Sequence, residues 1–323
     1  MEFRTITDLS DNLPRINHNE HILMLGSCFS DNIGERLRRA MFPVTINPFG
    51  TLYNPESIAM AIDRMLDGKP YQAEELIFHN GLWHSFAHHS RFSSVNPDNA
   101  LRKINREFTD SVESLKHLKH LFVTFGTAYA FRLKETGKIA ANCHKMPAAL
   151  FIRERMSVND ITGRWIPLLD RLFSLNPTLE VTFTVSPIRH LADGARQNTL
   201  SKATLLLASE TITSHDRRCH YFPAFEIMND ELRDYRFYAA DMTHPTEVAV
   251  DYIMERFSDA CFSEQTRRDA ASCEKLYRRI CHHPLTDDTE AIEKFRISTR
   301  QAANELADRL PHIRQTIENL FSK

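Results

Sequence analysis

Glycine and paired cysteines are both scarce in this chain. Only 9 of its 323 residues are glycine, and no stretch has the spacing of a phosphate-binding loop. The six cysteines are scattered, with no Cys-x-x-Cys pair among them. This pattern predicts neither a disulfide framework nor a zinc ribbon, so we expect reduced cysteines, no metal and no cofactor.

A strong net charge and long apolar runs are also missing. The formal net charge of -2 argues against a nucleic-acid-binding surface, because such surfaces concentrate lysine and arginine. No apolar run approaches the length of a membrane span, and the first residues lack the basic and then apolar layout of a secretory signal. We therefore expect a cytoplasmic protein that binds neither nucleic acid nor a membrane.

Apolar segments of strand length alternate with helical patterns over most of the chain. Strands are expected at residues 21–25, 121–126 and 179–185, and a hairpin at 76–83, where Asn-Gly favours a tight turn. Helices are expected at residues 30–40, 54–66, 97–116, 155–175, 194–213 and 245–257. Strands separated by helices pair in parallel, so the sequence predicts a three-layer αβα sandwich around a central, mostly parallel sheet.

The character of the sequence changes at about residue 263. No strand pattern follows, and apolar residues from Ile292 to Leu320 recur at spacings of three and four, as on one face of a helix. Pro311 should kink or break that helix. We expect residues 1–262 to form the main α/β domain and residues 263–323 a helical extension packed on it. A homodimer formed through these helices is the alternative.

A serine stands where the first predicted strand meets the first predicted helix. Ser27 would lie at the sheet edge where open α/β folds bind ligands, beside the free N–H groups of a helix N-terminus. Far downstream, Asp241 and His244 supply a carboxylate and an imidazole, the partners that a nucleophilic serine needs. We predict Ser27 as nucleophile, His244 as base and Asp241 as its orienting group. As simpler alternatives, Ser27 would only cap the helix, and Cys28 would be a rival nucleophile or, as we prefer, a packing residue.

This layout resembles the SGNH, or GDSL-type, hydrolases, in which a serine follows the first strand and an Asp-x-x-His pair precedes the last helix. It is more similar still to the GSCFA-domain family, a relative of those enzymes. The Gly-Ser-Cys-Phe run at residues 26–29 matches that family's signature, with Ser30 in the place of alanine. Further similar stretches lie at residues 47–51, 83–85, 88–90, 125–128, 142–145, 186–190 and 241–245. The resemblance implies a flavodoxin-like αβα fold and an ester-hydrolysing ancestry.

The resemblance also implies an oxyanion hole, with one departure. The broader hydrolases supply an asparagine from a Gly-x-Asn-Asp block, whereas here Thr127 follows the glycine of the equivalent strand. Each donor aimed at a developing oxyanion contributes on the order of 3 kcal/mol, so the replacement affects the rate. We expect the backbone N–H groups of Ser27 and Gly50 to act together with Thr127 or Asn142.

Several basic side chains are expected to line the substrate pocket. These are His88, His89, His144, Arg189 and His190. Arg189 is the best candidate, because its guanidinium fork can hold a carboxylate or a phosphate. Structural hydrogen bonding is the alternative for the others, and the adjacent pair His88 and His89 lacks the acidic neighbours of a zinc site.

Taken together, these features predict a serine-dependent ester hydrolase that acts on a small acyl ester, such as an acetyl ester of a carbohydrate. An O-acyltransferase with the same three residues is the first alternative. The second is a catalytically silent binding module whose C-terminal helices recruit a partner.

Overall fold

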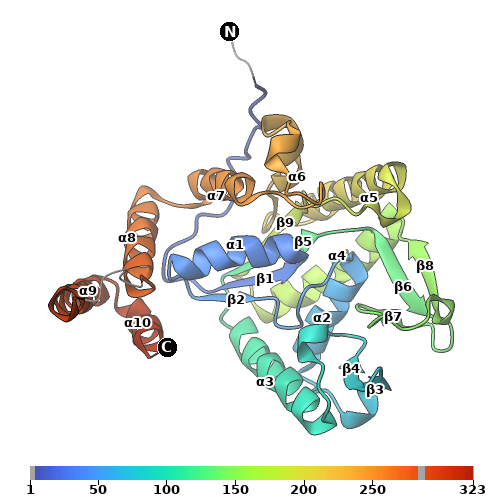
Figure 1. Ribbon diagram of the computed structural model, residues 1–323. Coiled ribbons are helices and arrows are strands. Elements are labelled where there is room, and N and C mark those ends of the chain that lie inside the picture. The colour runs from blue at the N-terminus through green and yellow to red at the C-terminus, as the bar shows by residue number, and fades with distance from the viewer. Residues whose placement is uncertain (1–3, 283–287, 323) are drawn as a thin grey trace.

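A five-stranded parallel sheet forms the centre of the computed structural model, which describes residues 4–282 and 288–322 (Figure 1). Its strand order is β10-β9-β5-β1-β2, and every pairing within it is parallel. The strands are β1 (Ile22–Gly26), β2 (Val44–Ile46), β5 (His120–Phe125), β9 (Glu180–Val185) and β10 (Cys219–Tyr221). The predicted parallel α/β fold is confirmed. The strands β2 and β10 were not predicted, because three residues are too few to show a pattern.

Helices cover both faces of this sheet. One face carries α1 (Cys28–Arg39) and α7 (Glu247–Cys261), and the other carries α2 (Pro55–Asp67), α3 (Pro97–Leu115), α4 (Val158–Leu175) and α5 (Ala195–Thr213). Successive side chains of a strand point to opposite faces. In β1, Leu23 and Leu25 accordingly pack with α2 to α5, whereas Ile22 and Met24 pack with α1 and α7. Because both faces are buried, the central strands are almost continuously apolar.

Two small antiparallel sheets stand beside the central one. The predicted hairpin is present as β3 (Leu76–His79) and β4 (Leu82–Ser85), with positive φ at both Asn80 and Gly81. The second sheet consists of β6 (Tyr129–Leu133), β7 (Ile139–Ala140) and β8 (Phe151–Arg155) and was not predicted. The helix expected from residue 155 begins at Val158 instead, because the Ser157 hydroxyl caps its first turn.

Short helical segments complete the fold. A three-residue α6 (Ala224–Glu226) continues into a π-helical turn at Ile227–Glu231. Single 3-10 turns lie at Ala73–Glu75, Ser90–Phe92, Ala148–Leu150, Leu191–Asp193, Tyr235–Phe237 and Pro311–Ile313.

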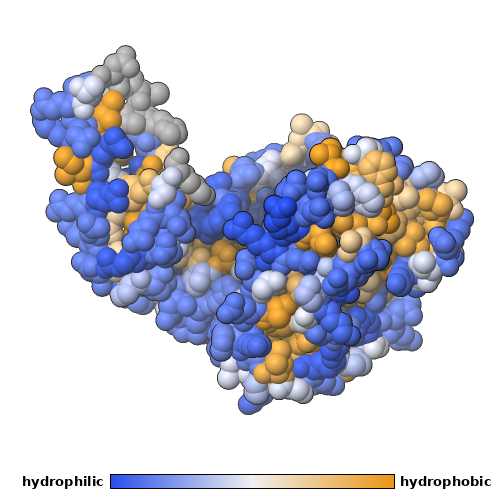
Figure 2. Space-filling model, turned by 90° about the horizontal axis from the view of Figure 1, so that it is seen from below, coloured by the Kyte–Doolittle hydropathy of each residue, from blue (hydrophilic) through white to orange (hydrophobic). Residues whose placement is uncertain are grey.

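The C-terminal helices stand out from the main body as an arm (Figures 1 and 2). They are α8 (Glu264–Ile280), α9 (Thr289–Arg309) and α10 (Arg314–Phe321), and the break expected at Pro311 separates the last two. Their side chains form a small core of their own, joined from the main domain by Met41. The domain boundary at residue 262 and a homodimer through these helices stay predictions. Within residues 4–282 and 288–322, no helix has both the length and the apolar character that crossing a membrane requires.

Candidate active site

The turn between β1 and α1 is tightly held. Gly26 has φ +144°, and a Cβ atom there would lie 2.3 Å from the Thr124 carbonyl oxygen, so only glycine fits. The next residue, Ser27, is fully buried and caps α1 by accepting a hydrogen bond from the Phe29 N–H at 3.3 Å. The side-chain oxygen of Asn47 stabilises the turn by accepting a hydrogen bond from the Gly26 N–H at 2.8 Å.

The predicted pair of Asp241 and His244 lies in the loop that leads into α7. The Asp241 Oδ2 atom is 2.6 Å from His244 Nδ1, and its Oδ1 atom accepts the backbone N–H groups of His244 and Thr243 at 2.9 Å each. These backbone donors, and then the imidazole, hold the pKa of Asp241 well below its usual range. The carboxylate is therefore charged at neutral pH and favours a proton on Nδ1, which leaves Nε2 as an acceptor.

The free nitrogen of this imidazole meets a cysteine rather than the predicted serine. His244 Nε2 lies 3.8 Å from the Cys28 sulfur, and Cys28 is a half-buried free thiol at the first position of α1. The Ser27 hydroxyl is turned into the protein and used by the helix cap. The expected contact of Ser27 with His244 is thus replaced by one from its neighbour, because adjacent side chains at a helix start diverge.

The Cys28 thiol is neutral at rest. Burial raises its pKa to about 11, and the nearby Asp31 carboxylate adds to that shift. The backbone N–H groups at the start of α1 and the Lys202 ammonium act in the opposite direction but are weaker. A thiol in this state needs a base to become a nucleophile, and the imidazole of His244 is in contact with it.

Arg189 holds the loop that carries the imidazole. Its backbone N–H donates to the Thr243 carbonyl at 3.1 Å, and its Nη1 donates to the Met242 carbonyl at 3.2 Å. Met242 has φ +58°, a left-handed conformation that a non-glycine residue keeps only when its surroundings impose it. Arg189, predicted as a substrate contact, therefore also positions His244.

His190 lies at the same edge of the sheet. A Cβ atom at Gly126 would lie 3.2 Å from the Ser27 Cβ and 3.4 Å from His190 Nε2. That nitrogen is buried and has no hydrogen-bond partner among the described residues. Burial, and then the charge of Lys202, lower the pKa of His190 to about 4, so the ring is neutral at pH 7.

The expected oxyanion donors differ in how far other bonds occupy them. The Gly50 N–H donates to the Asn47 carbonyl at 2.6 Å, and Thr127 Oγ1 bonds the Ser201 hydroxyl at 3.1 Å. The side-chain oxygen of Asn142 accepts the His144 N–H at 2.8 Å. The Gly50 N–H is therefore not free for an oxyanion in this structure, whereas the bond to Asn142 leaves its side-chain N–H groups unused within the described residues. The roles of Thr127 and Asn142 stay predictions.

A backbone N–H beside the thiol remains available. In the part of the chain described here, no oxygen accepts the N–H of Cys28, which points out of the α1 N-terminus beside the sulfur. This N–H takes the place of the one predicted on Ser27, which donates to the Thr124 carbonyl at 3.3 Å.

The remaining predicted pocket histidines gather around the β3–β4 hairpin. His88 stacks on Phe49, and its Nδ1 bonds the Ser85 hydroxyl at 2.9 Å. Burial lowers the pKa of His88 to about 3. His144 donates from Nε2 to the Ser85 carbonyl at 2.8 Å, and His89 accepts the Arg91 N–H. These bonds are compatible with the structural alternative, and substrate binding by the three histidines stays a prediction. No cluster of histidine, cysteine and acidic side chains suited to a metal occurs among residues 4–282 and 288–322.

The matched region of a family model includes every residue of this site. The model of the GSCFA family matches residues 21–257. The chain belongs to the GSCFA family. No curated protein matches the GSCFA chain significantly. Among solved structures, an acetyl xylan esterase from the rumen bacterium Butyrivibrio proteoclasticus aligns with 11% sequence identity and a TM-score of 0.34, over 75% of the GSCFA chain. The alignment spans 63% of that esterase, less than two thirds of its length.

Sequence reasoning ranked one residue of this site below its alternative and gave no sign of another. Cys28 was named as a rival nucleophile but packing was preferred, although the suitability of Ser27 as a helix cap was a signal. A serine that uses its oxygen for the cap leaves the next side chain free to face the cleft. Lys202 gave no signal, since nothing in a helical sequence pattern shows that a lysine will be buried at a sheet edge.

Proposed function

We propose that this GSCFA chain is an acyl-ester hydrolase whose nucleophile is the Cys28 thiol. The observation that supports the proposal is the 3.8 Å contact between the Cys28 sulfur and Nε2 of His244, whose Nδ1 bonds Asp241 at 2.6 Å. A nucleophile, a base and a carboxylate that orients the base form the recurrent arrangement of acyl-transfer enzymes. Such contacts are often loose in unliganded proteins and tighten when substrate binds.

The proposed reaction follows from these three groups. His244 Nε2 takes the thiol proton, and the thiolate attacks the ester carbonyl. The developing oxyanion accepts the Cys28 N–H, where the N-terminus of α1 adds a favourable field. The carbon–oxygen bond then breaks, and the proton on His244 passes to the leaving alkoxide. Water, deprotonated by His244, hydrolyses the thioester, and the proton returns to the thiol.

The accessibility of the two candidate nucleophiles favours the thiol. Ser27 is 0% exposed, so a substrate carbonyl has no open path to its oxygen in this conformation. Cys28 is half-buried, and about half of the His244 side chain is open to solvent, with a relative exposure of 49%. The serine-dependent mechanism expected from the sequence is therefore not the one that we propose.

The test is a set of variants assayed with p-nitrophenyl acetate, together with mass spectrometry of the trapped acyl-enzyme. We expect Cys28→Ala and His244→Ala each to lower kcat by about 10³-fold or more. Ser27→Ala should keep turnover within about tenfold and lose about 1 kcal/mol of stability, the typical contribution of a helix cap. Cys143→Ala, at another half-buried free thiol, is the matched control and should behave as wild type.

The acylated peptide decides between the two nucleophiles. We expect the acetyl group on Cys28 and its release by neutral hydroxylamine, which cleaves thioesters readily. An acetyl group on Ser27, or full activity in Cys28→Ala, would refute the proposal. Turnover of none of several simple esters, without an acyl-enzyme, would instead favour a silent binding module. Transfer to an added sugar faster than to water would identify an O-acyltransferase.

A further inference from the structure

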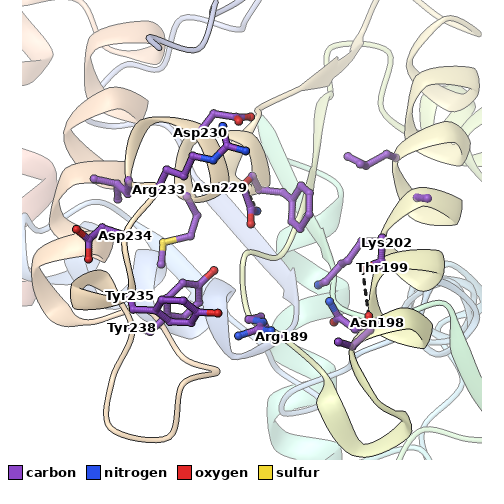
Figure 3. A pocket seen from close by; sticks show the side chains of 16 residues that line it. Arg189, Asn198, Thr199, Lys202, Asn229, Asp230, Arg233, Asp234, Tyr235 and Tyr238 are labelled. Carbon is purple, nitrogen blue, oxygen red and sulfur yellow. Dashed lines mark hydrogen bonds between the residues drawn. The ribbon is translucent and has the colours of Figure 1, made fainter. Parts of the chain in front are cut away.

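A pocket of about 540 Å³ opens beside the loop that carries His244 (Figure 3). Figure 3 shows Tyr235 and Tyr238 on one side, Asn198 and Lys202 on the other, and Arg189 between them. None of these side chains takes part in the proposed chemistry. The pocket therefore requires its own explanation.

One wall of the pocket carries two basic side chains, Arg189 and Lys202, that have no carboxylate partner among the described residues. Lys202 is 2% exposed, and its ammonium donates to the Gly126 and Ser186 carbonyls at 2.6 and 2.7 Å. One guanidinium nitrogen of Arg189 donates a hydrogen bond to the Met242 carbonyl. Over the described residues, no carboxylate forms an ion pair with Lys202 or Arg189. Burial lowers the pKa of Lys202 to about 7, as expected for an ammonium that lacks a nearby counter-charge, whereas the guanidinium of the half-buried Arg189 stays charged. An anion bound in the pocket would supply the counter-charge and favour the protonated form of Lys202.

The start of a helix adds to this wall. Ala195, at the first position of α5, and Asn198 in the same turn line the pocket. The helix begins without a side-chain cap, so its first N–H groups are available to an anion. The pocket's carboxylates, Asp230 and Asp234, lie across the cavity beside Arg233 (Figure 3).

The pocket adjoins the proposed reaction centre at two points. Arg189 holds the carbonyls of Met242 and Thr243, which immediately precede His244. The Lys202 ammonium binds the carbonyl of Gly126, the residue packed against Ser27 in the turn before the thiol. In support, Lys202 lowers the pKa of the Cys28 thiol. A molecule bound by both cations would therefore extend toward the sulfur.

We propose that this pocket binds the anionic end of the substrate, a carboxylate or a phosphate, through Arg189 and Lys202. The inference rests on the proposed function, for which it names the substrate class as an ester carrying a negative group on the part that enters the pocket. The Tyr235 and Tyr238 rings contact the uncharged portion. A guanidinium beside an ammonium suits either anion, because both offer several oxygens to the donors.

Binding is measured apart from catalysis, by titrating adipate and inorganic phosphate into the Cys28→Ala protein in a calorimeter. We expect at least one of them to bind and Arg189→Gln to weaken it by about tenfold or more, because bonds to charged groups contribute more than neutral ones. Arg217→Gln, at an exposed arginine beyond the C-terminal end of α5 and away from the pocket, is the matched control and should leave binding unchanged. Lys202→Met should act like Arg189→Gln. If that variant does not fold, Arg189→Gln alone decides.

The substrate class is tested with a neutral and an anionic ester of matched length, p-nitrophenyl hexanoate and mono-p-nitrophenyl adipate. We expect kcat/KM of the wild type to be about tenfold higher for the adipate, and Arg189→Gln to abolish that preference. Equal kcat/KM values, or binding of neither anion, would overturn the inference. Anion binding without hydrolysis of either ester would refute the proposed function and leave the anion site standing.

Discussion

The protonation state of Cys28 gives the most direct physical test of the site. A thiol at a helix N-terminus usually has a lowered pKa, and a thiolate–imidazolium pair would then exist at neutral pH. Here burial and the Asp31 carboxylate outweigh the helix and raise the pKa of Cys28 to about 11. The thiol should therefore stay protonated until the solution becomes strongly basic.

The expected slowing of alkylation follows from the raised pKa of Cys28. At pH 8, a thiol whose pKa is about 11 is ionised to about one part in a thousand, whereas the ordinary value of 9.0 gives about one part in ten. The more basic thiolate is also the better nucleophile, by about tenfold over this range. We thus expect iodoacetamide to alkylate Cys28 about tenfold more slowly at pH 8 than it alkylates an unperturbed thiol.

The assay follows alkylation of the Cys28 peptide by mass spectrometry from pH 6 to pH 11. We expect the rate constant to rise about tenfold for each unit of pH, without a plateau below about pH 10. Asp31→Asn removes a like charge and should speed alkylation at pH 8 by about threefold or more. Glu35→Gln, which removes a charge one turn further along α1, is the control.

Two outcomes would contradict this reasoning. A rate constant that levels off near pH 7 would mean that Cys28 is already a thiolate paired with His244, and base catalysis of thiol ionisation would not be needed. If the Asp31→Asn variant were alkylated as slowly as wild type, the Asp31 carboxylate would have no effect on the pKa of Cys28.

Two further predictions concern the base and the turn. Asp241→Asn should lower kcat by about 10² to 10⁴-fold in the ester assay, because an amide favours the tautomer with its proton on the wrong nitrogen of His244; kcat within threefold of wild type would contradict this. Gly26→Ala should cost more than about 3 kcal/mol in urea unfolding, since its Cβ would lie 2.3 Å from the Thr124 oxygen. Gly163→Ala, inside α4 with open space around it, should instead stabilise the protein by about 0.5–1 kcal/mol, and equal midpoints for the two would refute the steric argument.

The sequence by itself determined the three long strands of the central sheet, most helices and the carboxylate partner of His244. A strand buried on both faces appears in the sequence as a continuous apolar run. The Asn80-Gly81 turn requires positive φ at both residues, which asparagine and glycine tolerate better than others. The Asp241 and His244 pair was also readable, because a spacing of three residues lets one side chain bond the other within a single loop. The short strands β2 and β10 were not predicted. They are stabilised by pairing with neighbouring strands, and three residues show no hydrophobic pattern of their own.

Only the tertiary structure decided which side chain meets the imidazole. Consecutive residues of a helix point about 100° apart, so one position separates a buried cap, Ser27, from a thiol facing the loop of His244. The burial of Lys202 beneath two carbonyls was likewise hidden, because the carbonyls belong to Gly126 and Ser186, which the sheet brings together at the ends of β5 and β9. Contacts between distant segments depend on how the whole chain packs, so the local sequence pattern does not predict them.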